Sequence, residues 1–412
     1  MPSLAVTPFA VERWFGKYEF TTEINIAESC VQPMTPDELL ELAGLGEAER
    51  RELLGRVRLG YTDSLGLPEL REEVAALYPG TPADQVLITG GAIEANYLLA
   101  RALTVPGEEF VCLHPVYQQL YQVAADLGAR PVFWRLRWED GFRPDLDELE
   151  RLLEAHPGAR RLVINFPHNP TGAVLSPDEM KRLADIVVRH GVGGGGLLVH
   201  ADEVYRGLNL DPAAAPSPTI RQFLPDAVVT GSLSKAYGLP GLRIGWIVGP
   251  RPVIQKCWEL RDYTSISVSA LGETLAWQAL AHREAVLARN RAIARRNLAV
   301  LSAFVEENSV FLEWVPPKEG VVAFPRLLPA ALGLGRGPAA PGAGGDPSDR
   351  SVRTSRFRDS EDICRVLAEE HGVLLLPGTC FDEPLHFRLG FGYETDRLQT
   401  GLARLGAFFR GL

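Results

Sequence analysis

The sequence predicts an α/β protein: a large domain built on a mostly parallel sheet between helices, accompanied by a smaller α+β domain. From residue 67 onward, short apolar runs alternate with patterns of helical spacing, which is typical of a parallel sheet covered on both faces. The 412 residues are 46% hydrophobic, a composition and length that suit one large globular domain and one smaller one. From about residue 285 the pattern changes to one long Arg- and Ala-rich helix followed by shorter elements.

The elements of the large domain follow one another without an internal repeat. Helical spacing predicts helices over residues 67–78, 93–103, 116–128, 145–156 and 176–191. Apolar runs predict strands over residues 85–91, 109–115, 130–136, 160–167, 196–203, 227–235 and 241–249. Ligands of parallel sheets bind beyond the carboxyl ends of the strands, so we expect the functional residues at those ends.

Segment patterns divide the chain into three parts. We expect residues 1–50 to form an N-terminal arm and part of the small domain, residues 51–285 the large cofactor-binding domain, and residues 286–412 the C-terminal small domain. Residues 330–355 are poor in aromatic residues and rich in Gly, Pro and Ala. That composition predicts a flexible insertion in the small domain.

Charge and cysteine usage exclude some classes of function. The formal net charge of −10 argues against a nucleic-acid-binding protein, and no apolar run approaches the length of a membrane span. The five cysteines have no C-x-x-C spacing and the N-terminus has no apolar signal-peptide core, which favours a reducing cytoplasm. The run "GVGGGG" (191–196) follows a helix and precedes a strand, so it predicts a connection and not a dinucleotide site. No clustered metal-ligand spacing is found in the sequence.

Two strand ends carry features suited to an anion and to a polar ring. In "ITGGAIEAN" (88–96) a strand ends in two glycines and opens a helix, where backbone N–H groups can hold a phosphate. Glycine also occurs at such turns for steric reasons alone. In "NFPHNPTG" (165–172) two prolines set a rigid turn that either presents the amide of Asn169 or is an ordinary Asn-Pro turn.

Two further strand ends carry charge. In "HADEVY" (200–205) the carboxylate of Asp202 ends an apolar strand, so it either meets a cation or caps the following turn. In "SLSKAYGLPGLRIGW" (232–246), two serines and Arg243 form a second set of phosphate donors beside Lys235. An amine in such a place can act as a nucleophile toward a carbonyl.

One ligand, pyridoxal phosphate, satisfies all four features. It has a phosphate for the glycine turn and the serines, an aldehyde for Lys235, and a phenolic oxygen for Asn169 and Tyr205. Its ring nitrogen would meet Asp202, and a carboxylate there keeps that nitrogen protonated. A protonated ring withdraws electrons from a carbanion, which is the chemistry that this cofactor supplies.

These motifs resemble those of the class I/II aminotransferases, the pyridoxal-phosphate enzymes of fold type I. NPTG, D-x-x-Y and S-x-S-K-x(7)-R occur in the family's order, with 33 residues from Asn169 to Asp202 and 33 from Asp202 to Lys235. The resemblance extends from residues 60–75 to residues 386–392, which is most of the chain. It implies the family's seven-stranded sheet and an L-α-amino-acid substrate.

The resemblance also implies roles for the cofactor-binding residues. Lys235 would bind the cofactor covalently and move the α-proton, Asp202 would pair with the ring nitrogen, and Asn169 would bond the ring oxygen together with Tyr205. The residues that would hold the phosphate are Gly91, Ala92, Ser232, Ser234 and Arg243, and Ile93 is a further expected cofactor-binding residue.

Two tyrosines have a role only through the resemblance. Tyr117 occupies the place of an aromatic ring that stacks on the cofactor; the alternative is a core tyrosine on a helix. Tyr61 resembles the tyrosine that reaches across a dimer interface to the neighbouring subunit's phosphate, which implies a homodimer with shared active sites.

The predicted substrate-binding residues are Arg388, Glu28, Ser29 and Asn169. Arg388 resembles the arginine that clamps the substrate α-carboxylate in bidentate fashion; the alternative is a surface-strand arginine. The N-terminal arm of the usual aminotransferase supplies a small residue, commonly glycine, near the substrate. Here residues 27–31 read "AESCV", so Glu28 either meets a cationic substrate group such as guanidinium or is a surface carboxylate.

Two reactions are compatible with these residues. Transamination is the default of the family. The arm is also similar to that of the capreomycidine-synthase branch, whose members act in antibiotic pathways. Those enzymes remove the β-hydroxyl of a hydroxylated arginine and close a cyclic guanidine. A cofactor-binding regulatory module or a scaffold without cofactor is disfavoured, because Lys235 is present and no helix-turn-helix extension precedes residue 60.

Overall fold

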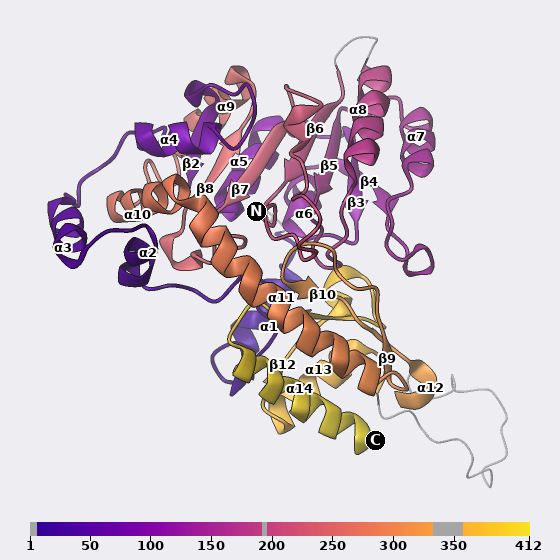
Figure 1. Ribbon diagram of the computed structural model, residues 1–412. Helices are drawn as coiled ribbons and strands as arrows, with labels where there is room; N and C mark the ends of the chain where they lie inside the picture. Colours follow the sequence, from indigo (N-terminus) through magenta and orange to yellow (C-terminus); the bar gives the residue numbers. More distant parts are fainter. Residues whose placement is uncertain (1–5, 192–195, 333–356) are drawn as a thin grey trace, which may run out of the picture. The chain divides into compact units, whose positions relative to one another are not determined.

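The computed structural model describes residues 6–191, 196–332 and 357–412 (Figure 1). Contacts divide the chain into two compact units. Among the described residues, the larger unit comprises 6–7, 30–191, 196–295 and 317–321. The smaller unit comprises Pro8–Ser29, Arg296–Pro316 and Val322–Leu412.

The larger unit alternates helices and strands along the chain. Its helices are α2 (Pro36–Leu42), α3 (Glu47–Arg56), α4 (Pro68–Ala75), α5 (Ala92–Leu103), α6 (Gln119–Asp126), α7 (Leu146–Ala155), α8 (Pro177–Gly191), α9 (Arg251–Arg261), α10 (Ala270–Ala281) and the first part of α11 (Arg283–Glu307). Its strands are β2 (Val86–Thr89), β3 (Glu109–His114), β4 (Arg130–Arg135), β5 (Arg161–Asn165), β6 (Leu198–Asp202), β7 (Val228–Ser232) and β8 (Gly245–Val248).

These strands form one seven-stranded sheet in the order β2-β8-β7-β6-β5-β3-β4. Strand β8 runs antiparallel to both of its neighbours, and the other pairs are parallel. The predicted mostly parallel seven-stranded sheet is therefore confirmed. The register aligns Asn165 with Asp202 and Asp202 with Thr230, so three polar residues lie side by side near the carboxyl ends of β5, β6 and β7.

The core of the larger unit explains why its strands are almost wholly apolar. Leu98 and Leu99 of α5 pack with Leu87 and Ile247 of the sheet and with Cys257 of α9. Side chains along a strand alternate between the two faces of the sheet. Every residue of β2, β5, β7 and β8 is buried, so both faces of these strands are covered. Helices accordingly cover both faces of the sheet (Figure 1).

The smaller unit is an α+β domain, as predicted. Its helices are α1 (Ala10–Tyr18), α12 (Pro329–Leu332), α13 (Ser360–Glu370), α14 (Thr395–Arg410) and the end of α11. Its short strands are β1 (Ile24–Asn25), β9 (Leu312–Glu313), β10 (Val322–Ala323), β11 (Arg326–Leu327), β12 (Val373–Leu374), β13 (Leu376–Pro377) and β14 (Phe387–Gly390). Strand β1 pairs with β12, and the Trp14 indole donates to the Leu375 carbonyl at 2.8 Å, so the N-terminal segment is built into the C-terminal part.

Contacts place the unit boundaries at 29/30 and 295/296, where the sequence suggested 50/51 and 285/286. Residues 30–50 join the larger unit because α2 packs against α10. Of the expected insertion at 330–355, residues 330–332 end α12 and the remainder lies outside the described residues, as do 192–195 of the glycine run. No helix in the described ranges is long and apolar enough to cross a membrane.

Replacing Gly390 with alanine is expected to destabilise the smaller unit. A Cβ at Gly390 would lie 1.6 Å from the Glu28 carbonyl oxygen, so the N-terminal segment would have to move away from β14. We expect the free energy of unfolding to fall by roughly 3 kcal/mol, measured by chemical denaturation of the apoprotein. The control is Gly16→Ala in α1, where a Cβ meets nothing within 4 Å; it should raise the free energy of unfolding by about 1 kcal/mol. Equal stability of the two variants would contradict this account.

Candidate active site

The centre of the site is the carboxylate of Asp202, at the end of β6. Asp202 is 5% exposed. Burial raises the pKa of its carboxyl to about 6, while hydrogen bonds from Asn96 and the Val204 N–H and the charge of Lys235 oppose that rise. A buried carboxylate of this kind is stabilised by a positive partner. The larger unit therefore contains a buried carboxylate, that of Asp202, which a bound cation would stabilise.

The turn that carries Asn169 is tied directly to the Asp202 strand. The Asn169 N–H donates to Asn165 Oδ1 at 2.8 Å, and Asn165 Nδ2 donates to the Asp202 carbonyl at 2.9 Å. His168 lies 2.7 Å from both Thr171 Oγ1 and the Pro115 carbonyl, and burial lowers its pKa to about 3, so it is neutral. Through these contacts the turns after β3 and β5 are held side by side.

Asn165, His168, Asn96 and Thr230 were not among the residues expected from the sequence. Asn165 and His168 belong to "NFPHNPTG", and polar side chains inside an otherwise apolar strand and turn were the available signal. Asn96 gave no such signal, because a single asparagine in a helix is ordinary on a solvent face. Only the packing of α5 on the sheet reveals that Asn96 is 3% exposed.

Tyr205 contributes a hydroxyl that lacks a protein partner. The side chain is 2% exposed, and its hydroxyl forms no hydrogen bond with any residue in the described part of the chain. Buried hydroxyl groups are nearly always hydrogen-bonded in folded proteins. An oxygen of a bound molecule would satisfy this group.

A glycine-lined turn lies between β2 and α5. Gly91 precedes the first residue of α5, Ala92, and has a φ of 87°, which favours glycine. A Cβ at Gly91 would lie 2.6 Å from Arg243 Nη2, and one at Gly245 would lie 2.5 Å from the Ala92 nitrogen. Only glycine lets these three segments approach so closely. The helix start, with its unpaired N–H groups, is thus bordered by a guanidinium, which suits a phosphate.

The strand register brings the serines to the same turn. Gly245 pairs with Thr89 of β2 on one side and with Ser232 of β7 on the other. Ser232 is buried, and its Oγ accepts from the Ser234 N–H at 3.3 Å. Arg243 has a φ of 53°, a left-handed conformation uncommon for arginine, and donates to the Gly90 carbonyl at 3.3 Å. The predicted phosphate donors, which are far apart in the sequence, therefore lie together at the turn between β2 and α5.

The remaining predicted residues of the larger unit have less uniform surroundings. Lys235 lies three residues after β7 and is half-buried. Its positive charge acts to lower the pKa of the Asp202 carboxyl. Tyr117 precedes α6, so it is not on the helix predicted over 116–128, and it packs partly buried against the cluster of Phe110 and Cys112. Ile93 is 38% exposed and Tyr61 is 85% exposed.

The predicted substrate residues Arg388, Glu28 and Ser29 all lie in the smaller unit. Arg388 is 2% exposed in β14, which rules out a surface arginine, and its Nη2 donates to the Ala27 carbonyl at 3.0 Å. Glu28 Oε1 accepts from Arg397 Nη2 at 3.3 Å and from Asn25 Nδ2 at 3.2 Å. Ser29 is 8% exposed. The arm residues and Arg388 are thus neighbours within this unit.

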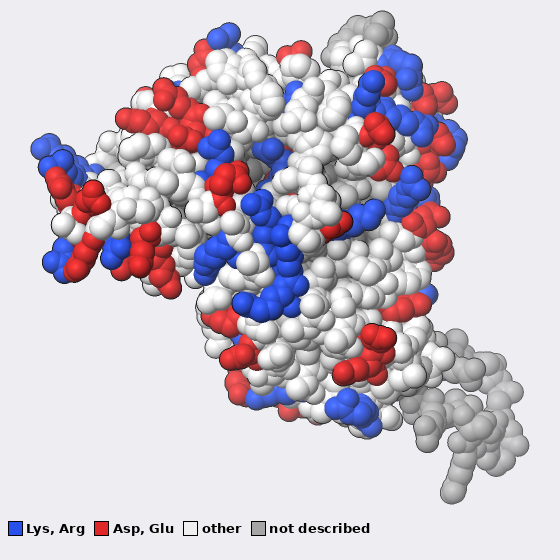
Figure 2. All heavy atoms as spheres, viewed as in Figure 1, with Lys and Arg blue, Asp and Glu red and all other residues white. Residues whose placement is uncertain are grey.

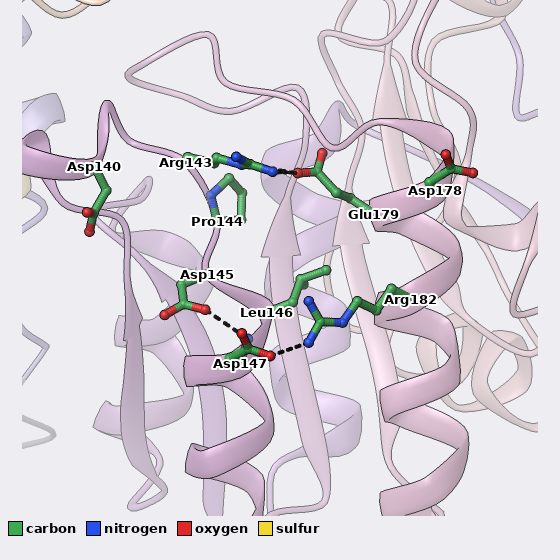
Figure 3. Close-up of a pocket in the computed structure, with 9 residues that line it drawn as sticks. All are labelled: Asp140, Arg143, Pro144, Asp145, Leu146, Asp147, Asp178, Glu179 and Arg182. Atoms are coloured by element: carbon green, nitrogen blue, oxygen red, sulfur yellow. Dashed lines mark hydrogen bonds and ion pairs between the residues drawn. The ribbon is translucent and has the colours of Figure 1, made fainter.

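A separate surface hollow of about 600 Å³ lies at the N-terminal ends of α7 and α8 (Figure 3). Its charged side chains interact with one another and with the helix ends. Asp145 caps α7, and Arg143 forms an ion pair with Glu179 of α8 at 3.0 Å. Arg182 also pairs with Asp147. Figure 2 shows acidic and basic side chains interspersed over this face. None of the predicted site residues lines this hollow.

Replacing Gly245 with alanine is expected to weaken cofactor binding. The added Cβ would displace the start of α5 and so the phosphate-binding N–H groups. We expect the Kd for pyridoxal phosphate, measured by fluorescence titration of the apoprotein, to rise about tenfold or more. Gly241→Ala is the matched control, since a Cβ there meets nothing within 4 Å and the Kd should not change. An unchanged Kd in Gly245→Ala would contradict this description of the turn.

A family model described as aminotransferase class I and II matches residues 34–405. The chain belongs to this family. Among its relatives, capreomycidine synthase of Streptomyces vinaceus is 34% identical over 97% of this chain and 94% of that protein. Aspartate aminotransferase of Pyrococcus horikoshii is 28% identical over 84% and 80%.

Solved structures of the family confirm the fold. A PLP-dependent aminotransferase from Streptococcus suis 89-1591 superposes with a TM-score of 0.85 at 32% identity, covering 99% of this chain and 98% of that one. The PLP-dependent cyclase OrfR superposes with a TM-score of 0.82 at 29% identity, covering 98% and 97%. This aminotransferase-family chain is accordingly an enzyme, and its cofactor is pyridoxal phosphate.

The described residues fit that cofactor. Tyr205 has a buried hydroxyl in need of a partner, and Asp202 is an acid whose burial calls for a cation. The glycine turn and Arg243 leave space and charge for a phosphate.

Proposed function

We propose that Lys235 binds the aldehyde carbon of pyridoxal phosphate and carries the α-proton of an L-α-amino acid. Asp202 pairs with the ring nitrogen, and Asn169 and Tyr205 bond the ring oxygen. When bound, the cofactor supplies an electron-poor ring that stabilises negative charge at the substrate Cα. The unpartnered hydroxyl of Tyr205 and the raised pKa of Asp202 support these roles.

The phosphate is held by the start of α5 and by groups from two other strands. The proposed phosphate-binding residues are Gly91, Ala92, Ile93, Ser232, Ser234 and Arg243. Tyr117 stacks on the ring. Support comes from the close approach of Gly91 to the Arg243 guanidinium and from the register that aligns Ser232 with Gly245.

The substrate α-carboxylate is bound by Arg388, with Asn169 and Ser29 as further contacts. Burial of a guanidinium at 2% exposure is favourable when anionic or carbonyl oxygens face it, and Ala27 supplies one such oxygen. A substrate carboxylate supplies the others in a bidentate arrangement.

For the reaction, we propose the conversion of a β-hydroxylated arginine to a cyclic guanidine. Once the α-proton is removed, the β-hydroxyl would leave with a proton as water; a guanidine nitrogen would then bond to Cβ and lose its proton, and Cα would regain one. The 34% identity with capreomycidine synthase over 97% of this chain carries this proposal. Glu28 supports it, because its carboxylate already accepts a guanidinium, that of Arg397, in a partly exposed pair that a substrate can replace.

Transamination is the second candidate. The likeness to a PLP-dependent aminotransferase at 32% identity over 99% of this chain favours it. In this reaction Lys235 would move the α-proton, the bound cofactor would accept the amino group, and the substrate would be released as a keto acid.

A substrate panel without added keto acid separates the two reactions. The holoenzyme is supplied with L-arginine, its β-hydroxy derivative and common L-amino acids. A product lighter than the β-hydroxy derivative by one water, with no pyridoxamine phosphate, is expected. Stoichiometric pyridoxamine phosphate and a keto acid would instead establish transamination. Glu28→Gln should raise KM for the arginine derivative about tenfold and leave cofactor binding unchanged.

We also propose a homodimer in the cytoplasm. Tyr61 at 85%, Leu59 at 87% and Tyr263 at 89% exposure are large apolar side chains of the larger unit that a second subunit would cover. Tyr61 would reach the second subunit's phosphate. All five cysteines are free thiols, as is usual in a reducing compartment. Sedimentation of the holoenzyme as a monomer would overturn the dimer.

A further inference from the structure

Beneath Asp202 lies a cluster of three buried polar side chains that do not reach the cofactor site themselves. Asn96 comes from α5, His200 from β6 and Thr230 from β7, and they are 3%, 5% and 0% exposed. Asn96 Nδ2 donates to Asp202 Oδ2 at 3.0 Å. The other carboxylate oxygen, Oδ1, accepts from the Val204 N–H at 3.2 Å.

The two neighbours of Asn96 determine which way its amide faces. Thr230 Oγ1 donates to Asn96 Oδ1 at 2.9 Å, and His200 Nε2 lies 3.2 Å from the same oxygen. Burial, together with the charge of Arg161, lowers the pKa of His200 to about 3, so the ring is neutral and carries one proton. With that proton on Nε2, both neighbours donate to Oδ1, and the amide N–H must face Asp202.

The reverse orientation of the amide conflicts with a charged Asp202. Turning the amide over would set Asn96 Oδ1 against a carboxylate oxygen, so that two buried acceptors would be in contact. Other titratable groups are coupled to Asp202 as well: the charge of Lys235, from the segment after β7, favours the charged form of Asp202, and the charge of Asp202 raises the pKa of the adjacent Glu203. The amide differs from Lys235 because it favours the carboxylate without adding a charge.

We propose that Asn96 is a positioning residue that holds the Asp202 carboxylate charged and in one orientation, and that Thr230 and His200 fix the direction of its amide. The proposal rests on the function proposed above for Asp202. A neutral donor is suited to this place: it keeps the carboxylate ionised and leaves the ring nitrogen of the cofactor as a positive partner. A second fixed cation would compete with that nitrogen.

The test uses the apoprotein, so that it does not depend on the cofactor. The side-chain carboxyl carbons of aspartate are labelled with ¹³C, and the Asp202 signal is assigned as the one missing in Asp202→Asn. In Asn96→Leu, which keeps the branched shape of the side chain but cannot donate, the titration midpoint of Asp202 should rise by about one to two pH units. Thr230→Val should raise it by a smaller amount, whereas Thr230→Ser, which keeps the hydroxyl, should restore the wild-type midpoint.

A control separates positioning from packing. Leu99→Ala removes a fully buried side chain of the same helix that belongs to the apolar cluster with Leu87 and Ile247, so it should lower stability and leave the Asp202 midpoint unchanged. Wild-type midpoints in both Asn96→Leu and Thr230→Val would overturn the proposal. If Asn96→Leu does not fold, the Thr230→Val and Thr230→Ser pair decides.

A second measurement distinguishes this proposal from the function on which it rests. The affinity of the apoprotein for pyridoxal phosphate should fall in Asn96→Leu, Thr230→Val and Asp202→Asn alike. Shifted midpoints with unchanged cofactor affinity in Asp202→Asn would uphold the positioning role of Asn96 and overturn the role proposed for Asp202. An affinity that falls only in Asp202→Asn would overturn the positioning role.

Discussion

Replacement of Lys235 by alanine is expected to abolish covalent attachment of the cofactor and nearly all turnover. In the proposed site the lysine amine is the nucleophile for the cofactor aldehyde and the group that moves the α-proton. Among the described residues, no other lysine lies within three residues of the end of a strand of the large sheet. We expect kcat to fall roughly 10⁴-fold or more. Borohydride treatment followed by peptide mass spectrometry should find the reduced adduct on Lys235 in the wild type and on no peptide of the variant.

The matched control is Lys256→Ala. Lys256 is an exposed residue of α9 in the same unit, and this substitution should change neither adduct nor kcat. An adduct on another lysine of Lys235→Ala, with turnover retained, would show that the site has been assigned to the wrong residue.

Asp202→Asn is expected to remove activity and to stabilise the apoprotein. Without the carboxylate the ring nitrogen loses its proton, so kcat should fall roughly 10²- to 10³-fold. The native fold raises the pKa of Asp202 from 3.8 to about 6. An acid with a raised folded-state pKa destabilises the fold at pH values above that pKa, and this effect vanishes below its unfolded value.

The stability difference should therefore depend on pH with a definite sign. At pH 8 the Asp202→Asn apoprotein should unfold with a free energy up to about 3 kcal/mol higher than the wild type. The difference should shrink as the pH falls through 6 and should be absent below pH 4. Thermal unfolding of both apoproteins across this range measures it. A wild-type apoprotein that is the more stable at pH 8 would contradict the burial described for Asp202.

The sequence predicted the large sheet because its strands are short apolar runs separated by helices, and local patterns of this kind survive folding. The sequence also indicated Asp202 and Arg243 as candidate site residues, because a charge beside an apolar strand costs free energy unless it has a partner of opposite charge. Lys235 stood out for the same reason. Such residues can be recognised in the sequence because they carry a charge next to an apolar segment.

Other parts of the site depend on packing that no local pattern records. Asn96 is polar on a helix face that only the register of α5 against the sheet makes dry. The inclusion of residues 30–50 in the larger unit depends on the contact of α2 with α10, two segments far apart in sequence. Tyr117 was expected on a helix, but α6 begins only at Gln119, because the chain leaves β3 through a proline-containing turn.

The antiparallel strand β8 has a consequence for the order in which the enzyme is made. Strand β2 has no partner in the sheet except β8, and their paired residues Thr89 and Gly245 are 156 positions apart (245 − 89). During synthesis β2 must therefore wait, as an unpaired strand, until more than half of the chain has left the ribosome. Contacts between residues so far apart in the sequence form slowly. Until they form, the unpaired strand edge is exposed and prone to aggregation. Because the proposed phosphate site includes Arg243 and the start of β8, the cofactor should bind after β8 has been inserted between β2 and β7, and holoenzyme formation should then report completion of the large unit.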